Sequence, residues 1–177
     1  MGFKDKVIII TGSGAGIGRQ LAVELAAMGA KLVINSTRQQ TGAETLSMEQ
    51  QAGAEAIFVQ ADVSKPEEAK LIVDETLKAF GRIDVLYNIA GIVLGGTVWN
   101  TTVEDFDRTM AVNVRGTLLM MQEAVPQMQK QGGGVIVNTA SVVATKGLKN
   151  RVAYSASKGA VLSMTRAVAA ELTRENI

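Results

Sequence analysis

The sequence predicts an α/β protein built on a doubly wound parallel β-sheet of the Rossmann type. Short segments rich in β-branched residues alternate with longer segments of helical periodicity, which is the pattern of repeated βαβ units. The first such segment, residues 7–10, is Val-Ile-Ile-Ile and is apolar on both faces, as expected of a central parallel strand. Right-handed crossovers with a reversal after the third strand place this strand at the centre of the sheet, and the ligand crevice at the carboxyl ends of the strands.

The first helix begins after a glycine-rich turn that directly follows the first strand. Ile17, Leu21, Leu25 and Met28 recur at helical spacing and predict the core face of this helix. Gly29 predicts its end.

The third helix is predicted from a start signal, a core face and a stop signal. Residues 64–67, Ser-Lys-Pro-Glu, read as a capping box with a proline in the first turn. Gly81 predicts the end of the helix. Its predicted core face comprises Ala69, Ile72, Val73, Leu77 and Phe80.

The remaining elements continue the same alternation. A loop around Gly95 and Gly96 leads to a helix capped near Thr101, and three glycines at 132–134 end a long helical stretch. The predicted strands are 7–10, 31–35, 56–60, 83–87 and 135–137. The other predicted helices are 40–52, 112–130 and 152–174.

Length, charge and hydropathy point to one globular domain that spans residues 1–177. The net charge is +1, with 18 basic and 17 acidic residues, so neither nucleic acid nor an anionic membrane is an expected partner. No apolar run has the length of a membrane span, and no leader-like apolar segment follows the first residues. The expected location is therefore the cytoplasm.

The chain contains neither cysteine nor histidine. Disulfides, a thiol nucleophile and a thiolate or imidazole metal site are thereby excluded, and no metal site is expected. Acid–base chemistry must therefore come from Asp, Glu, Lys or one of two tyrosines, Tyr87 and Tyr154.

The glycine-rich turn at residues 11–18 fits the pattern T-G-x-x-x-G-x-G and does not fit G-x-G-x-x-G. Such a turn lets the backbone approach a pyrophosphate closely, and the following helix presents free N–H groups to it. The turn by itself fits a simple strand-to-helix connection about as well. Its position between a buried strand and an amphipathic helix favours dinucleotide binding.

The end of the second strand should carry the group that meets the adenosine ribose. The sequence there is Asn35-Ser36-Thr37-Arg38, which contains no carboxylate. A carboxylate would hold a 2′-hydroxyl and repel a 2′-phosphate, whereas two hydroxyls and an arginine can accept the phosphate. The segment therefore favours NADP over NAD, and a polar turn with no role in binding remains the alternative.

Tyr154 and Lys158 lie four residues apart at the start of the last helix, which places them on one helical face. A free tyrosine titrates near pH ~10, and one ammonium at about 4 Å in a medium of effective dielectric ~20 contributes about 4 kcal/mol in favour of the phenolate. The pair is therefore sufficient for acid–base work without histidine. An isolated pair of this kind is more often a surface contact, so its context decides between the two interpretations.

Together these motifs resemble the short-chain dehydrogenase/reductase family over essentially the whole chain. The family's N-N-A-G stretch corresponds here to residues 88–91, with Ile89 in place of the second asparagine. The residues that match the family's motifs are Thr11, Gly12, Gly16, Gly18, Asp62, Val63, Asn88, Ala90, Gly91, Asn113, Gly116, Ser141, Tyr154 and Lys158.

The resemblance implies an NAD(P)-dependent oxidoreductase that interconverts a ketone or oxoacyl carbonyl and a secondary alcohol by hydride transfer. Tyr154 would donate a proton to the carbonyl oxygen or remove it from the alcohol, and Ser141 would orient that oxygen. Lys158 would favour the phenolate and hold the nicotinamide ribose, and Asn113 would anchor a water in a proton relay. The expected cofactor-binding residues are Gly12, Ser13, Gly16, Ile17, Gly18, Ser36, Arg38, Asp62, Val63, Asn88, Ala90, Gly91, Tyr154 and Lys158.

The resemblance also implies more chain than the sequence contains. In the family a sixth strand, a proline-glycine contact to the nicotinamide, a substrate-covering segment and a seventh strand follow the last helix. This sequence stops at residues 175–177, where the sixth strand would begin. The domain is therefore expected to be incomplete at its carboxyl end and to lack its last two strands, with an open fifth strand and no readable substrate specificity.

Two expectations concern partners and alternative functions. The helices at 112–130 and 152–174 commonly pair between subunits in this family, which implies a homodimer or homotetramer. A nicotinamide-binding sensor or scaffold without turnover is the alternative function, and the presence of Asn113, Ser141, Tyr154 and Lys158 argues against it. An isomerase or dehydratase that uses the cofactor transiently is a third interpretation.

Overall fold

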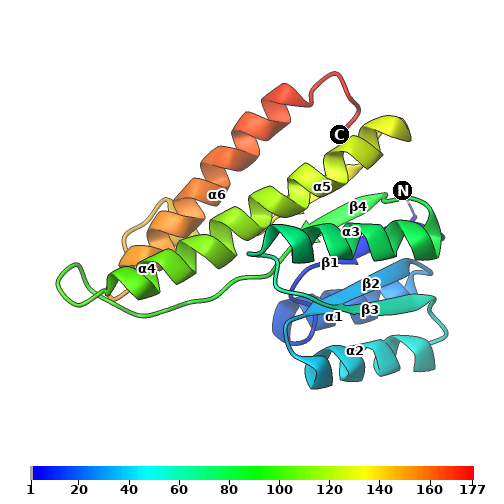
Figure 1. Ribbon diagram of the computed structural model, residues 1–177, viewed down its shortest axis with the longest axis horizontal. Helices are drawn as coiled ribbons and strands as arrows, with labels where there is room; N and C mark the ends of the chain where they lie inside the picture. The colour runs from blue at the N-terminus through cyan, green and yellow to red at the C-terminus, as the bar shows by residue number, and fades with distance from the viewer. Residues whose placement is uncertain (1) are drawn as a thin grey trace.

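The computed structural model describes residues 2–177 and contains a five-stranded parallel sheet in the order β3-β2-β1-β4-β5 (Figure 1). The predicted doubly wound sheet with the first strand at its centre is therefore confirmed. Each predicted strand is present, with ends that differ by no more than two residues. The strands are β1 Val7–Ile10, β2 Lys31–Ser36, β3 Ala56–Gln60, β4 Val85–Asn88 and β5 Val135–Asn138.

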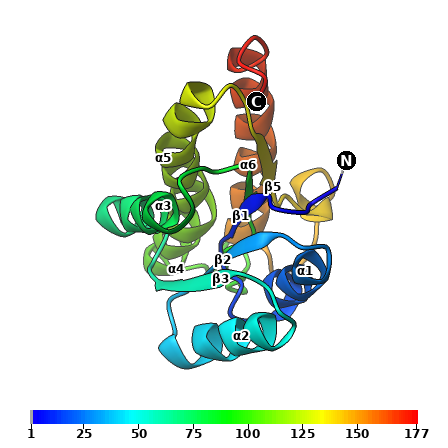
Figure 2. The same cartoon turned by 90° about the vertical axis from the view of Figure 1, so that its right-hand side faces the viewer.

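Helices cover both faces of the sheet, with α1 and α2 on one side and α3 and α5 on the other (Figure 2). A π-helical segment, Ala111–Arg115, joins α4 to α5, and a short 3₁₀ turn, Val142–Ala144, precedes α6. The α-helices are α1 Gly16–Ala27, α2 Gln39–Gln51, α3 Pro66–Phe80, α4 Val103–Met110, α5 Gly116–Lys130 and α6 Val152–Glu171.

The central strands feed two separate cores because their side chains alternate between the faces of the sheet. Ile8 and Ile10 of β1 pack with the α1 side, whereas Ile9 packs with the α3 and α5 side. All three side chains are fully buried. The apolar run that predicted a central strand thus reflects burial on both faces.

The predicted core face of α1 is partly wrong. Ile17 is 74% exposed and Met28 is 53% exposed, whereas Ala22, Leu25 and Ala26 are buried. Small residues at the contact let α1 lie close to the sheet, and Ile17 is left at the mouth of the crevice described below. The helix ends before Gly29, as predicted.

The predicted capping box at the start of α3 is also wrong. Ser64 donates its hydroxyl to Asp62 Oδ1 at 2.7 Å, so that hydroxyl does not cap the helix, and Lys65 is the N-cap residue. Glu68 accepts from the Asp62 N–H at 2.6 Å, in place of the predicted Glu67. The helix ends at Gly81 with φ +74°, as predicted.

The predicted helix 112–130 is part of a longer rod. The segments α4, Ala111–Arg115 and α5 run on without a break, and Figure 1 shows them as one long helix beside the start of α6. The predicted cap near Thr101 belongs to Thr102, whose hydroxyl accepts from the Asp105 N–H at 3.0 Å. The last helix ends at Glu171 rather than at residue 174.

Strand β5 forms one edge of the sheet among the described residues, where it pairs with β4 alone. Val135 is 50% exposed and Val137 is 38% exposed, so this edge is apolar, as expected. None of the helices in residues 2–177 is long and apolar enough to span a bilayer.

Candidate functional site

A crevice of about 690 Å³ lies at the carboxyl ends of β1, β2 and β4, the edge of the sheet predicted for ligand binding. Ten of the residues predicted to bind the cofactor line this crevice. They are Gly12, Gly16, Ile17, Gly18, Ser36, Arg38, Asp62, Val63, Ala90 and Gly91.

The glycine-rich turn lines the crevice, and at three of its glycines a side chain would collide with neighbouring atoms. Gly12 has φ +67°, and a Cβ atom there would lie 2.8 Å from Ala90 Cα. A Cβ at Gly14 would lie 2.6 Å from the hydroxyl of Ser36, and one at Gly18 would lie 2.8 Å from the carbonyl oxygen of Gly12. These approaches explain why glycine occupies all three positions.

Buried polar side chains hold the turn in place. Asn35 accepts from the Gly12 N–H at 3.2 Å, and its amide nitrogen donates to carbonyl oxygens of β3 and the residues just after it. Ser13 is fully buried and donates its hydroxyl to Ile10 at 2.7 Å. Ser13 is not among the residues that line the crevice, and its hydroxyl anchors the turn to β1. Its predicted contact with the cofactor stays a prediction.

Segment 88–91 is held against the same turn. The buried Thr11 hydroxyl accepts from the N–H groups of Ile89 and Ala90 at 3.0 and 3.1 Å. Asn88 is buried behind this contact and donates to Asn138 Oδ1 at 2.9 Å. Asn88 therefore links β4 to β5 and does not line the crevice, unlike Ala90.

The start of α1 offers hydrogen-bond donors to the crevice. Its N-cap residue is Ala15, no side chain caps the helix, and its first turn contains no acidic residue. The free N–H groups and the positive end of the helix dipole favour an anion at this position. The glycine cradle and these donors together fit the pyrophosphate of a dinucleotide.

The end of β2 places Ser36 and Arg38 at one end of the crevice. The Ser36 hydroxyl accepts from the Arg38 N–H at 3.1 Å and lies 3.2 Å from the hydroxyl of Thr41. The Arg38 side chain is exposed, and within residues 2–177 no carboxylate forms an ion pair with it. Ser36, Thr37 and Arg38, the polar residues that the sequence placed here, all line the crevice.

Several lining residues were not predicted. Arg108, Ala111 and Val112 reach the crevice from α4 and the π-helical segment, and Thr41 and Ser64 reach it from two other elements. None of them belongs to a motif that predicts cofactor binding. The fold brings them to the crevice, because the α4–α5 rod passes the carboxyl edge of the sheet.

Lys158 and Tyr154 lie beside each other on α6, as predicted. The Lys158 Nζ atom lies 5.8 Å from the centre of the Tyr154 ring and donates to the Thr139 carbonyl at 2.6 Å. Lys158 is only 4% exposed, and this burial lowers the pKa of its ammonium group. A Cβ at Gly91 would lie 3.6 Å from Nζ, so the ammonium adjoins the segment that lines the crevice.

Ser141 follows β5 and caps the 3₁₀ turn Val142–Ala144. Its hydroxyl accepts from the Val143 N–H at 3.4 Å. This turn packs against α6, the helix that carries Tyr154. The structure therefore brings Ser141, Tyr154 and Lys158 to the carboxyl end of the sheet. None of the three is among the residues that line the crevice, and the ammonium group of Lys158 approaches it at Gly91.

Asn113 lies in the π-helical segment and is 1% exposed. Its amide oxygen accepts from the Ile92 N–H at 2.8 Å, and its amide nitrogen donates to the Ile92 carbonyl at 3.0 Å and to the Ser157 hydroxyl at 2.9 Å. The side chain therefore links Ile92, which lines the crevice, to α6.

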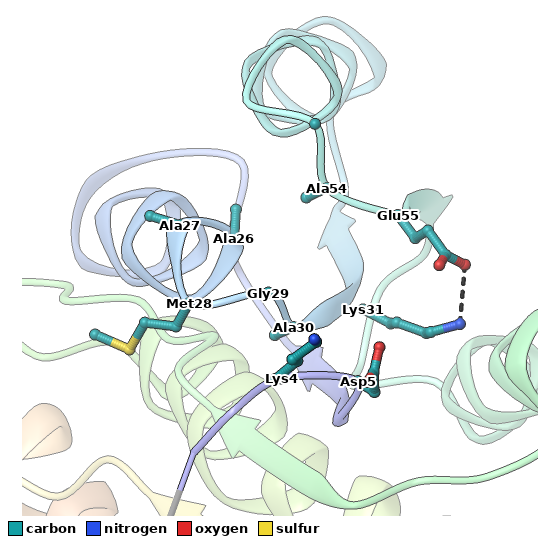
Figure 3. Close-up of a pocket in the computed structure, with 11 residues that line it drawn as sticks. Lys4, Asp5, Ala26, Ala27, Met28, Gly29, Ala30, Lys31, Ala54 and Glu55 are labelled. Carbon is teal, nitrogen blue, oxygen red and sulfur yellow. Dashed lines mark hydrogen bonds and ion pairs between the residues drawn. The ribbon is translucent and has the colours of Figure 1, made fainter.

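A second hollow, of about 420 Å³, lies at the opposite edge of the sheet (Figure 3). It is bounded by the ends of α1 and α2 and by the residues just before β1. Lys31 in this hollow is paired with Glu55 at 3.0 Å. The hollow contains neither the glycine cradle nor the tyrosine–lysine pair, so the larger crevice is the candidate site.

Comparison with known proteins identifies relatives of this chain. The short chain dehydrogenase family model matches residues 6–177. An uncharacterized oxidoreductase of Thermotoga maritima is 48% identical over 171 residues, which cover 97% of this chain and 67% of that protein. Levodione reductase of Leifsonia aquatica is 38% identical over 178 residues, with coverages of 99% and 67%.

A similar solved structure is a short chain dehydrogenase/reductase from Burkholderia phymatum in complex with NAD. It matches with a TM-score of 0.95 and 36% identity, and the match covers 98% of this chain and 62% of the other. The chain thus spans about two thirds of the length of the relatives it matches.

Proposed function

The chain belongs to the short-chain dehydrogenase/reductase family, and on this premise we propose that it carries the cofactor-binding and catalytic parts of an NAD(P)-dependent oxidoreductase. The reaction is the interconversion of a ketone or oxoacyl carbonyl and a secondary alcohol. The observation that carries this proposal is the buried Lys158 beside Tyr154, next to a crevice whose glycine-rich turn fits a dinucleotide.

The crevice supplies binding and orientation. Gly12, Gly16 and the free N–H groups at the start of α1 would hold the pyrophosphate. Asp62 and Val63, which also line the crevice, would contact the adenine. When bound, the nicotinamide group supplies or accepts the hydride at the substrate carbon.

The protein's own residues move the proton. In the reducing direction the Tyr154 hydroxyl donates its proton to the carbonyl oxygen as that oxygen gains charge, and in the oxidising direction the phenolate removes the proton from the alcohol. Lys158 favours the phenolate electrostatically, and its burial strengthens this interaction because water screens it less. The Ser141 hydroxyl orients the substrate oxygen.

The direct test is Tyr154→Phe. Loss of the phenolic proton donor should lower turnover with a panel of ketones by at least about 100-fold, with cofactor affinity unchanged. Tyr87→Phe is the matched control, because Tyr87 is the other tyrosine of the chain and lies in β4. Stopped-flow or steady-state assays at 340 nm measure turnover, and titration of cofactor fluorescence measures affinity. Unchanged turnover in Tyr154→Phe would favour a binding protein without catalysis.

For the cofactor, the proposal is NADP in preference to NAD. Its support is that Ser36 and the exposed Arg38 both line the crevice, with no carboxylate among residues 35–38. A 2′-phosphate would be met there by a cation and a hydroxyl, which a 2′-hydroxyl does not require.

A further inference from the structure

The side chain of Asn113 has no unused hydrogen-bonding group. Both protons of its amide nitrogen are donated, one to the Ile92 carbonyl and one to the Ser157 hydroxyl, and its oxygen accepts from the Ile92 N–H. Because Asn113 is only 1% exposed, its amide group is closed to solvent and to a substrate in the crevice. The Asn113 side chain therefore acts on the site by holding other groups in place.

The hydroxyl of Ser157 accepts one of these bonds and donates another. Its side chain is fully buried, and its hydroxyl accepts from Asn113 and donates to the Tyr154 carbonyl at 2.8 Å. A single hydroxyl thus joins the π-helical segment to the first turn of α6. The chain of bonds runs from Ile92 at the crevice, through Asn113 and Ser157, to the backbone of Tyr154.

We propose that Ser157 is a positioning residue, whose hydroxyl fixes Tyr154 relative to the crevice by bonding Asn113 and the Tyr154 carbonyl at the same time. This inference rests on the proposed function, because Tyr154 is the proton donor there. It assigns a task to the second of the two serines between Tyr154 and Lys158.

The task requires a group that donates and accepts at once, which makes the proposal specific. Alanine does neither and would leave one Asn113 N–H buried without an acceptor. Threonine keeps the hydroxyl. Because a displacement of about 1 Å in a reacting group can cost about 100-fold in rate, loosening this link should show in the chemical step rather than in cofactor binding.

The kinetic test compares Ser157→Ala, Ser157→Thr and Ser163→Ala, the last an exposed serine on the same helix. Ser157→Ala should lower kcat at least tenfold with KM for the cofactor within twofold of wild type, and should shift the pH dependence of kcat. Ser157→Thr should recover most of the rate, and Ser163→Ala should match wild type. If Ser157→Ala keeps the wild-type kcat and pH profile, or if Ser157→Thr is folded and as slow as Ser157→Ala, the proposal is wrong.

A second measurement does not depend on turnover. In ¹H–¹⁵N spectra, the side-chain amide protons of Asn113 (identified by their loss in Asn113→Asp) should exchange slowly with solvent in wild type and in Ser157→Thr. In Ser157→Ala they should exchange at least tenfold faster, whereas unchanged exchange would overturn the link. A wild-type protein that turns over no carbonyl compound but shows this exchange pattern would contradict the proposed function and leave the Asn113–Ser157 link standing.

Discussion

At the scale of single residues, Arg38 is the side chain on which the proposed preference for NADP depends. It lines the crevice and forms no ion pair within residues 2–177, so its charge is available to a 2′-phosphate. Arg38→Ala should weaken NADPH binding about tenfold and NADH binding less than twofold, as expected for loss of one charge-assisted contact. Isothermal titration with both cofactors measures the difference. Arg166→Ala, which removes an exposed charge from α6, is the control, and equal losses for both cofactors would rule out the NADP preference.

Glu49 is a carboxyl that the proposed mechanism does not use. It is fully buried in α2, neither of its carboxyl oxygens has a hydrogen-bond partner among the described residues, and burial raises its pKa from 4.5 to about 7. The folded protein then holds a proton that the unfolded chain releases between these values, so stability falls as pH rises from 4.5 to 7.

Glu49→Gln should therefore stabilise the protein more at pH 8 than at pH 5, by about 2–3 kcal/mol. Urea unfolding at the two pH values measures this difference, and Glu24→Gln, an exposed site on α1, is the control. The same gain at both pH values would show that the buried carboxyl does not titrate in this range.

At the same scale, motifs predicted the location of the crevice better than the side chains that face it. Ser13 and Asn88 belong to motifs, yet their side chains form hydrogen bonds within the fold. Ser13 donates to the Ile10 carbonyl of β1, and Asn88 donates to Asn138 of β5. Arg108 belongs to no motif and lines the crevice. Motif spacing follows the path of the backbone, whereas the partner of a buried polar group depends on strands that meet only in the fold.

At the scale of elements, the glycine turn permits a test that separates backbone strain from steric conflict. Gly12 and Gly53 have φ of +67° and +81°, but a Cβ at Gly12 would meet Ala90 at 2.8 Å, whereas one at Gly53 would meet nothing within 4 Å. Gly53→Ala should cost about 1 kcal/mol, from the left-handed backbone alone. Gly12→Ala should cost more and weaken cofactor binding at least about tenfold, because segment 88–91 must move.

Thermal unfolding and cofactor titration of both variants check this prediction. Similar losses of stability, with cofactor affinity kept in Gly12→Ala, would mean that the close approach to Ala90 is not needed for binding.

Most elements were predicted well because periodicity and glycine stops are local signals. The π-helical segment Ala111–Arg115 was not predicted, because the contacts of Asn113 with Ile92 and Ser157 that accompany it join parts of the chain far apart in sequence.

At the scale of the whole molecule, the predicted pairing of α5 and α6 between subunits remains a prediction. Leu118 of α5 is 38% exposed, which makes it a suitable probe. Leu118→Glu should lower the mass measured by light scattering to that of one subunit, because a charge would be buried at the interface. Leu71→Glu is the control, because Leu71 is 42% exposed on α3. An assembly that survives Leu118→Glu and dissociates with Leu71→Glu would place the interface elsewhere.

The strand order β3-β2-β1-β4-β5 was predictable at this scale, because few topologies satisfy right-handed crossovers around a central apolar strand. The sequence did not predict which polar side chains line the crevice and which form hydrogen bonds inside the fold, since this depends on contacts between the sheet and the helices.

The π-helical segment also has a consequence for rotational phase. An α-helix advances about 100° per residue, so one additional residue in a turn rotates everything before it relative to everything after it. Downstream, Met120, Met121 and Ala124 point into the sheet. Upstream, α4 packs against α6 and presents Arg108 to the crevice. One continuous rod therefore has two inward faces, one that builds the core and one that borders the site.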